Sequence, residues 1–162
     1  MYDEWLFAKH THFYDALPHY FMEFDVFDTE KRVFLDTVKC DGLLGGLVEP
    51  VKALSAGTFK QLKELQSLIG RSNFITDKHH ENLNAAALEV GVDPFEAWKH
   101  TDPSEKMEGL YVKWEEDGIV KGRYKYVRDT FTNAILSQDS HWYDRPIIQN
   151  RLAEGALERM FA

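Results

Sequence analysis

The segment from Glu108 to Val127 constrains the fold more than any other part of the sequence. Glu108 to Trp114 has the composition of a strand, Glu115-Glu116-Asp117-Gly118 has the chemistry of a tight turn, and Ile119 to Val127 is strand-forming again. Strands joined by a turn this short pair with opposite directions. The segment therefore predicts a β-hairpin, and the fold must accommodate antiparallel strands.

The second strand of this hairpin reverses the charge of the chain. Overall there are 27 Asp and Glu against 19 Lys and Arg, for a formal net charge of −8. Residues 119–128 nevertheless carry four basic side chains and no acidic one. Lys121, Arg123 and Lys125 alternate along the strand, so they share one face, where such a row can bind phosphate oxygens. The alternative is a solvated edge strand on which lysines only deter pairing.

Glu108 begins the partner strand, so the hairpin brings a carboxylate near this basic row. A carboxylate beside phosphate-binding cations suits a divalent metal ion that bridges phosphate and protein. The alternative is an exposed cross-strand ion pair, which contributes little to stability. Glu108 is therefore a candidate metal ligand.

The first 28 residues read as strand, loop and strand, with strands expected over 2–8 and 20–27. Nine aromatic residues fall within the first 27 positions, which makes this part core or the wall of a binding site. Along the second strand Met22, Phe24 and Val26 form an apolar face opposite a mixed one. This alternation predicts a strand with its back in the core and its front lining a site.

Periodicity and capping residues predict the remaining elements. Short strands are expected over 33–35 and 47–52, and helices over 37–44, 55–69, 79–90, 93–99 and 129–136. The stretch of about 55–100 reads as a helical insertion between two sheet regions. The order of elements favours an α+β fold with a largely antiparallel sheet. Since no linker or repeat interrupts residues 1–162, we expect a single domain.

Composition bounds the setting in which the chain works. At 162 residues and 44% hydrophobic content it can bury a core and is not a disordered tail. No apolar run approaches the ~20 residues of a membrane span, so no membrane partner is expected. Cys40 is the single cysteine, which excludes an internal disulfide and predicts a reducing, cytoplasmic location.

Four segments resemble, in order, motifs of the covalent nucleotidyltransferases, the group of nucleic-acid ligases and capping enzymes. Asp3-Glu4-Trp5 with Ala8-Lys9-His10-Thr11 resembles motif III, and Phe21-Met22-Glu23-Phe24-Asp25-Val26-Phe27 resembles motif IIIa. Glu108-Gly109-Leu110-Tyr111-Val112-Lys113 resembles motif IV, and Arg123-Tyr124-Lys125 resembles motif V, usually Lys-x-Lys. The ending Ser140-His141-Trp142-Tyr143-Asp144-Arg145-Pro146-Ile147 resembles that of bacterial ATP-dependent RNA ligases.

The resemblance implies the nucleotidyltransferase (ligase, ATP-grasp-like) fold and ATP-dependent RNA joining with Mg²⁺ or Mn²⁺. In such ligases a lysine attacks the α-phosphate of ATP, AMP passes to a 5′-phosphate, and a 3′-hydroxyl of an RNA end displaces it. By analogy Glu4 holds the ribose hydroxyls, and Phe21 stacks on adenine with Phe24 behind it. For Phe24 plain core packing is the favoured alternative.

The resemblance also assigns the catalytic groups. Glu108 would organise the metal ion or the lysine, and Arg123 and Lys125 would hold the α-phosphate. Each role suits its residue type, since carboxylates bind metal ions and cations offset phosphate charge.

The nucleophile motif is out of place. Lys39-Cys40-Asp41-Gly42 matches motif I, Lys-x-Asp-Gly, yet it follows motif IIIa, whereas the family has motif I first. We interpret the match as a coincidence at the start of a helix. The sequence then corresponds to the carboxy-terminal two-thirds of a ligase domain without its amino-terminal strands, and motif I is expected upstream of Met1 or on a separate amino-terminal half.

Two functional hypotheses follow from this interpretation. The first is a partial domain of an ATP-dependent RNA ligase that cannot adenylylate itself alone. The alternative is a non-catalytic nucleotide- or RNA-binding remnant of that fold. In both cases the lost strands would leave an unpaired edge and apolar surface, which predicts a homo-oligomer.

Overall fold

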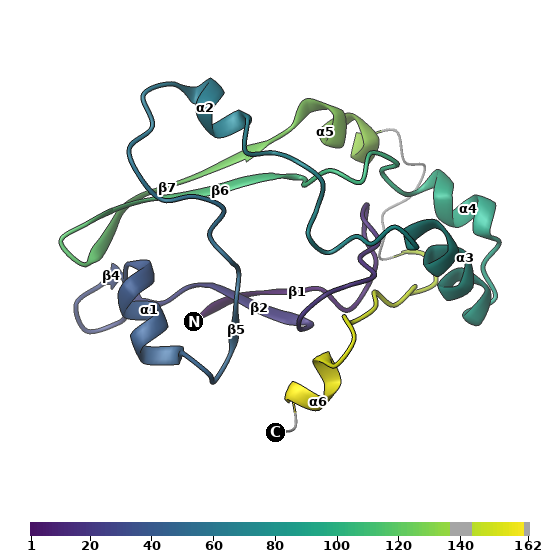
Figure 1. Ribbon diagram of the computed structural model, residues 1–162, viewed down its shortest axis with the longest axis horizontal. Coiled ribbons are helices and arrows are strands. Elements are labelled where there is room, and N and C mark those ends of the chain that lie inside the picture. The colour runs from purple at the N-terminus through teal and green to yellow at the C-terminus, as the bar shows by residue number, and fades with distance from the viewer. Residues whose placement is uncertain (137–143, 161–162) are drawn as a thin grey trace. The chain divides into compact units, whose positions relative to one another are not determined.

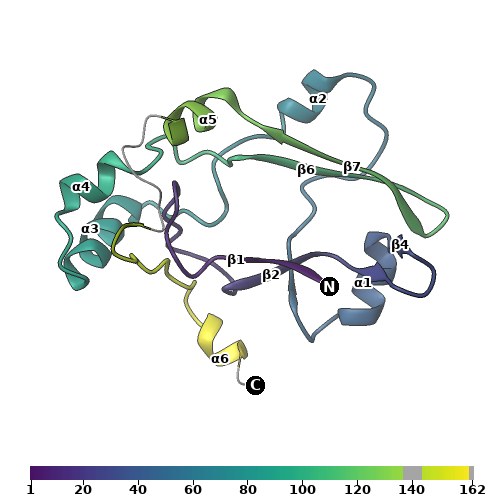
Figure 2. The same ribbon diagram turned by 180° about the vertical axis from the view of Figure 1, so that it is seen from behind.

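The computed structural model describes residues 1–136 and 144–160. The chain forms two compact units, each assembled from three segments. Unit 1 comprises residues 1–5, 21–69 and 109–126, and unit 2 comprises residues 6–20, 70–108 and the chain from 127 onward. Strands concentrate in unit 1 and helices in unit 2 (Figures 1 and 2), so the mixed α+β class is confirmed. The expectation of a single domain stays a prediction.

The strands of unit 1 form three small sheets. β1 (Tyr2–Trp5) pairs antiparallel with β2 (Phe21–Asp25), whose other edge pairs in parallel with β5 (Glu49–Pro50). β3 (Phe27–Asp28) and β4 (Val33–Phe34) form a separate antiparallel pair. Pairing is mainly antiparallel, as expected, but it is not gathered into one larger sheet. The strand expected over 47–52 shortens to β5, where the proline lacks an N–H to donate.

The strand expected over 2–8 ends at Trp5 because the following residues bond to a distant part of the chain. Asn150 is fully buried, and its side-chain amide donates to the carbonyls of Leu6 and Ala8 at 2.8 and 3.3 Å. Both partners belong to unit 2. The amide of Asn150 thus takes the place of a strand partner, and β1 stops where unit 2 begins.

The predicted hairpin is present and long (Figures 1 and 2). β6 (Gly109–Glu116) and β7 (Ile119–Val127) flank a two-residue turn, Asp117-Gly118, in which both φ angles are positive, at 54° and 78°. Positive φ at both central positions is the geometry of the tight hairpin turn whose twist matches that of the strands. The turn residues in the sequence therefore predicted correctly where the chain reverses direction.

The helix predicted over 37–44 is confirmed as α1 (Thr37–Leu44), and its start is attached to the hairpin turn. The Asp36 side chain caps the helix by accepting the N–H of Lys39. The N–H and hydroxyl of Thr37 both donate to Glu115 Oε1, at 2.9 and 2.6 Å. These bonds fix the tip of the hairpin within unit 1.

The helix predicted over 55–69 is wrong in extent. Only α2 (Leu62–Gln66) is helical, and none of its residues is buried. Gly57 has a φ of +147°, and Gln61, at the N-cap position, makes no side-chain capping bond. An apolar helical spacing without a surface to pack against leaves nothing to stabilise the longer helix.

Unit 2 contains the helical core. α3 (His79–Glu89) and α4 (Pro94–Lys99) follow the predicted ranges closely and pack together, with Asp93 capping α4 through the N–H of Phe95. The described part of this unit also contains α5 (Asp129–Leu136) and α6 (Ala156–Met160). No helix in the described ranges is long and apolar enough to span a membrane. The buried core cluster consists of Phe13, Leu83, Ala86, Ala87, Ala97 and Ile148.

A buried ion pair between Asp102 and Arg128 holds this unit together. Arg128 donates to the Asp102 carboxylate, to Ser104 Oγ at 2.8 Å and to the Met107 carbonyl at 2.8 Å. Both charged residues are buried. The network joins the start of the α5 segment to the loop before β6.

Removing one partner of this pair should destabilise the protein strongly. Asp102→Ala leaves a buried guanidinium without its carboxylate, which costs about 3–5 kcal/mol. The measurement is the unfolding free energy from urea titration. Lys31→Ala, which removes an exposed partner of Asp28, is the control and should cost less than about 1 kcal/mol. Equal effects of the two substitutions would contradict a buried, structural pair.

Candidate functional site

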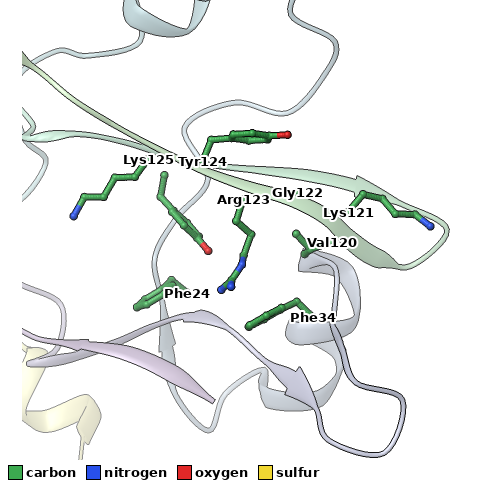
Figure 3. A pocket seen from close by; sticks show the side chains of 9 residues that line it. Phe24, Phe34, Val120, Lys121, Gly122, Arg123, Tyr124 and Lys125 are labelled. Carbon is green, nitrogen blue, oxygen red and sulfur yellow. The ribbon is translucent and has the colours of Figure 1, made fainter.

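An open pocket of about 570 Å³ lies along the hairpin within unit 1, and we call it the hairpin pocket (Figure 3). Its lining combines aromatic rings with basic side chains. Figure 3 shows Arg123 directed from β7 toward Phe24 and Phe34, with Lys121 and Lys125 pointing toward opposite ends. The volume falls within the range of small-molecule sites. The lining residues are Phe24, Phe34, Tyr111, Val120, Lys121, Gly122, Arg123, Tyr124 and Lys125.

Asp25 organises one side of this pocket. Its side chain is fully buried, and Oδ2 accepts the Tyr111 hydroxyl at 2.5 Å and the Arg123 guanidinium at 3.0 Å. Lys113 approaches Oδ1 at 4.0 Å and donates to the Phe24 carbonyl at 3.3 Å. A buried carboxylate is stable only when it is compensated in this way. Asp25 therefore ties β2 to both strands of the hairpin.

Aromatic contacts shape the other side. The Arg123 guanidinium lies over the Phe34 ring, 3.6 Å from its centroid. Phe24 packs edge-on against Tyr111, with ring centroids 5.5 Å apart and an interplanar angle of 77°. Phe24 is half-buried. It belongs to the pocket wall, so plain core packing does not describe it.

The two outer cations of the row differ from Arg123. In the described part of the chain Lys121 and Lys125 make no hydrogen bond or ion pair, and both are exposed. Their ammonium groups are available to an anion at the pocket, whereas the charge of Arg123 is shared with Asp25. Phosphate oxygens are the natural ligand of such a row.

Burial and the hydrogen bond to Asp25 raise the pKa of Tyr111 to about 12. Both effects disfavour the phenolate, because it would place a second negative charge beside a buried carboxylate. The Tyr111 hydroxyl therefore remains a hydrogen-bond donor to Asp25 at neutral pH.

The predicted site residues fall into separate groups. Phe24, Arg123 and Lys125 line the hairpin pocket together. Glu4 on β1 lies opposite Met22 on β2, and Phe21 lies opposite Trp5. These two are exposed and are not among the pocket-lining residues, so their predicted contacts with ribose and adenine stay predictions.

Glu108 belongs to unit 2, one residue before β6. Its Oε1 accepts the hydroxyl of Tyr14 at 3.0 Å, and its carbonyl accepts the N–H of Arg128. A carboxylate is a ligand type that hard divalent metal ions take. Its predicted metal role is not tested by these contacts.

The lysine of the motif I-like segment lies near the hairpin turn. Lys39 Nζ donates to the Gly118 carbonyl at 2.8 Å, and Lys39 is not among the residues that line the hairpin pocket. Burial raises the pKa of the neighbouring Cys40, so its thiol is not activated. The contacts of Lys39 are those of a residue that supports a turn.

The carboxy-terminal motif is described only in part, because Ser140 to Tyr143 lie outside the described residues. Arg145 lines a second pocket, of about 210 Å³, within unit 2. Lys9 also lines it and donates to the carbonyls of His10 and His100 at 2.9 and 2.8 Å. Burial, with a smaller effect of Arg145, lowers the pKa of Lys9 to about 7.

Several residues that line the pocket or support its wall were not singled out by sequence reasoning. Asp25 and Tyr111 sit inside the segments that resemble motifs IIIa and IV, but nothing in their spacing marks them as partners. Phe34 comes from β4, which carries no motif. Asp25 is recognised by the full burial of its carboxylate within a strand. Burial is seen only in the structure, so the sequence alone could not mark this residue.

A family model described as RNA ligase matches residues 1–127. The match ends with β7 and includes every residue of the hairpin pocket. The search of curated proteins and the search of solved structures each returned no match.

The environment of Tyr111 predicts a pH dependence of stability. A tyrosine in the unfolded chain ionises near pH 10, so between about pH 10 and 12 the unfolded state loses a proton that the folded state keeps. Stability contributed by Tyr111 is complete below about pH 10 and falls above it. Urea midpoints at about pH 8 and 11 should therefore differ less in Tyr111→Phe than in the unmodified chain.

Tyr124→Phe is the matched control, since Tyr124 is exposed on the same hairpin and makes no hydrogen bond in the described ranges. It should keep the full pH dependence of the unmodified chain. Identical pH dependence in Tyr111→Phe and the unmodified chain would contradict the proposed bond between Tyr111 and Asp25.

Proposed function

Because the chain belongs to the RNA ligase family, we propose that it is part of an ATP-dependent RNA ligase domain and binds ATP in the hairpin pocket. One observation carries the proposal. Aromatic rings (Phe24, Phe34 and Tyr111) and uncompensated lysines meet in one pocket of about 570 Å³. A nucleotide needs an aromatic surface for its base and cations for its phosphates.

Different side chains contact the base and the phosphates of the nucleotide in this proposal. Phe24, predicted to lie behind the stacking residue Phe21, lines the pocket, and we assign it a contact with adenine. Phe21 and Glu4 would reach the base and the ribose, as the family resemblance implies. Lys125 contacts the α-phosphate as a mobile point charge. Arg123, held by Asp25 at 3.0 Å, offers a positioned guanidinium to the same phosphate.

The proposed reaction is transfer of AMP. A lysine amine forms an N–P bond to the α-phosphorus while the bond to pyrophosphate breaks, and AMP then passes to a 5′-phosphate oxygen of RNA. The 3′-hydroxyl of a second RNA end displaces AMP and closes the strand. Cations at the α-phosphate stabilise the charge that develops on its oxygens in the first step.

Glu108 is the proposed ligand of Mg²⁺ or Mn²⁺. A hydrogen-bonded carboxylate suits both hard cations, which take oxygen ligands, and a divalent ion would neutralise charge on the nucleotide phosphates. The assignment rests on the family resemblance and on the chemistry of the residue.

The alternative function, nucleotide binding without catalysis, is favoured by one specific observation. Lys39 carries the motif I-like pattern, and its amine is hydrogen-bonded to the carbonyl of Gly118 in the hairpin turn. A lysine amine that is bonded to the turn supports the hairpin and does not attack a phosphorus atom. The nucleophile would then have to come from outside residues 1–162.

Lys125→Ala should weaken ATP and AMP binding by about tenfold or more, because a charge-assisted phosphate contact is worth about 1.5–3 kcal/mol. The melting temperature should change little, since an exposed strand lysine contributes within about 0.5 kcal/mol. Isothermal titration calorimetry and thermal unfolding measure the two quantities.

Lys52→Ala, at an exposed lysine of unit 1 outside the pocket lining, is the control and should bind both nucleotides as the unmodified chain does. A lower melting temperature in Lys125→Ala with unchanged nucleotide affinity would mean that the basic row is structural, and nucleotide binding at this pocket would be refuted.

The chain alone should not form a covalent AMP adduct when incubated with ATP and Mg²⁺. Intact-mass measurement at neutral pH, where a phosphoramidate persists, tests this. Lys39→Ala serves as the reference sample. An adduct that appears in the unmodified chain and disappears in Lys39→Ala would make Lys39 the nucleophile and overturn its assignment to the turn.

A further inference from the structure

His79, His80 and Glu105 bring three metal-binding groups together in unit 2, apart from the hairpin pocket. The two histidines are the first residues of α3, and Glu105 lies in the loop before β6. One ligand atom from each residue lies within 4.8 Å of the others. Imidazole nitrogen and carboxylate oxygen are ligands of Zn²⁺ and related ions.

The hydrogen bond of His79 fixes which ring nitrogen is available. Nε2 is 2.9 Å from the carbonyl oxygen of Phe13, which can only accept, so Nε2 carries the proton. Nδ1 then presents a lone pair. A ligating histidine in proteins typically donates its other N–H to a carbonyl in this way.

Nδ1 of His79 is buried and has no hydrogen-bond partner among the described residues. It faces Glu105 Oε1 at 3.7 Å. This distance is too long for a hydrogen bond, and burial lowers the pKa of His79, which favours the neutral ring. Two acceptors therefore face each other, and a cation between them would satisfy both.

The other two residues are held in place by contacts that leave ligand atoms available. The His80 ring stacks on Trp98, with centroids 4.1 Å apart and an interplanar angle of 21°. Glu105 Oε2 accepts Arg71 Nε at 3.1 Å, which leaves Oε1 directed toward His79. Packing and one ion pair thus orient the cluster.

We propose that His79 Nδ1, the His80 ring and Glu105 Oε1 bind one Zn²⁺ ion, with water as the fourth ligand. Zinc bonds of 2.0–2.2 Å in a tetrahedron place ligand atoms about 3.4 Å apart. The separation of His79 Nδ1 and Glu105 Oε1, 3.7 Å, is close to this value. All three ligand atoms lie within 4.8 Å of one another, so separations must shorten by at most about 1.4 Å to close the site. Two imidazoles and one carboxylate favour Zn²⁺ over Mg²⁺, which prefers oxygen ligands throughout.

The ion would link the start of α3 to the loop before β6, both within unit 2. No residue that lines the hairpin pocket takes part. The proposal does not depend on the proposed ligase function, and nucleotide binding plays no part in its test.

The experiment titrates ZnSO₄ into the full chain, stripped of metal with a chelator, by isothermal titration calorimetry. We expect one Zn²⁺ per chain and a higher melting temperature with zinc than without. His80→Ala and Glu105→Gln should each weaken binding at least about tenfold. Replacing Zn²⁺ by Co²⁺ should give the strong visible absorption of a tetrahedral site.

His19→Ala and Glu96→Gln are the matched controls, since both residues lie in unit 2 outside the cluster, and they should bind zinc as the unmodified chain does. Because His80 is exposed, His80→Ala keeps the test valid even where Glu105→Gln disturbs Arg71. Failure to bind one equivalent of zinc, or equal affinity in His80→Ala and the unmodified chain, would refute the site.

Discussion

The buried carboxylate of Asp25 is the constraint on which the arrangement of unit 1 depends. With no exposed surface the carboxylate needs compensation from the protein. Its Oδ2 accepts hydrogen bonds from Tyr111 and Arg123, and the Lys113 ammonium lies 4.0 Å from Oδ1. These donors come from both strands of the hairpin, so satisfying one charge positions β6 and β7 over β2. Desolvating a carboxylate costs several kcal/mol, and the hairpin position is fixed by the need to offset that cost.

The same constraint divides the basic row into two kinds of cation. Arg123 compensates Asp25 and lies over the ring of Phe34, so it is rigid and its charge is shared. Lys125 has no such partner in the described ranges and keeps its full charge for an anion. The pocket thus combines one cation that is shared with Asp25 and two lysines without such a partner in the described ranges, beside aromatic rings. This combination suits a nucleotide, which offers a flat base and charged phosphates.

Unit 2 relies on buried polar groups in a comparable way. Asn150 satisfies backbone carbonyls of an early segment, and the pair of Asp102 and Arg128 links α5 to the loop before β6. The carboxylate of Glu105 differs from these groups, since one of its oxygens faces the unpartnered Nδ1 of His79. Two acceptors that face each other at this distance fit a cation between them, which is the basis of the proposed zinc site.

The sequence predicted correctly the helices and the hairpin whose caps and turn residues are local sequence signals. The turn at Asp117-Gly118 fixed the hairpin, and the caps at Asp36 and Asp93 fixed α1 and α4, because each signal acts within four residues. Periodicity alone failed over 55–69, where the apolar spacing has no surface to cover. Motif order indicated the family that the family model confirms. Three residues of those motifs, Phe24, Arg123 and Lys125, line one pocket, and their roles there stay predictions.

Only the tertiary structure decided which distant residues compensate one another. Tyr111 and Asp25 are 86 positions apart in the sequence. Glu105 lies in the loop before β6 and approaches His79 at the start of α3. No local sequence pattern could predict either pair. The sequence by itself determined the α+β class, the hairpin and its basic strand. The structure decided the pocket wall and the histidine cluster, because burial of charge is a property of packing and not of spacing.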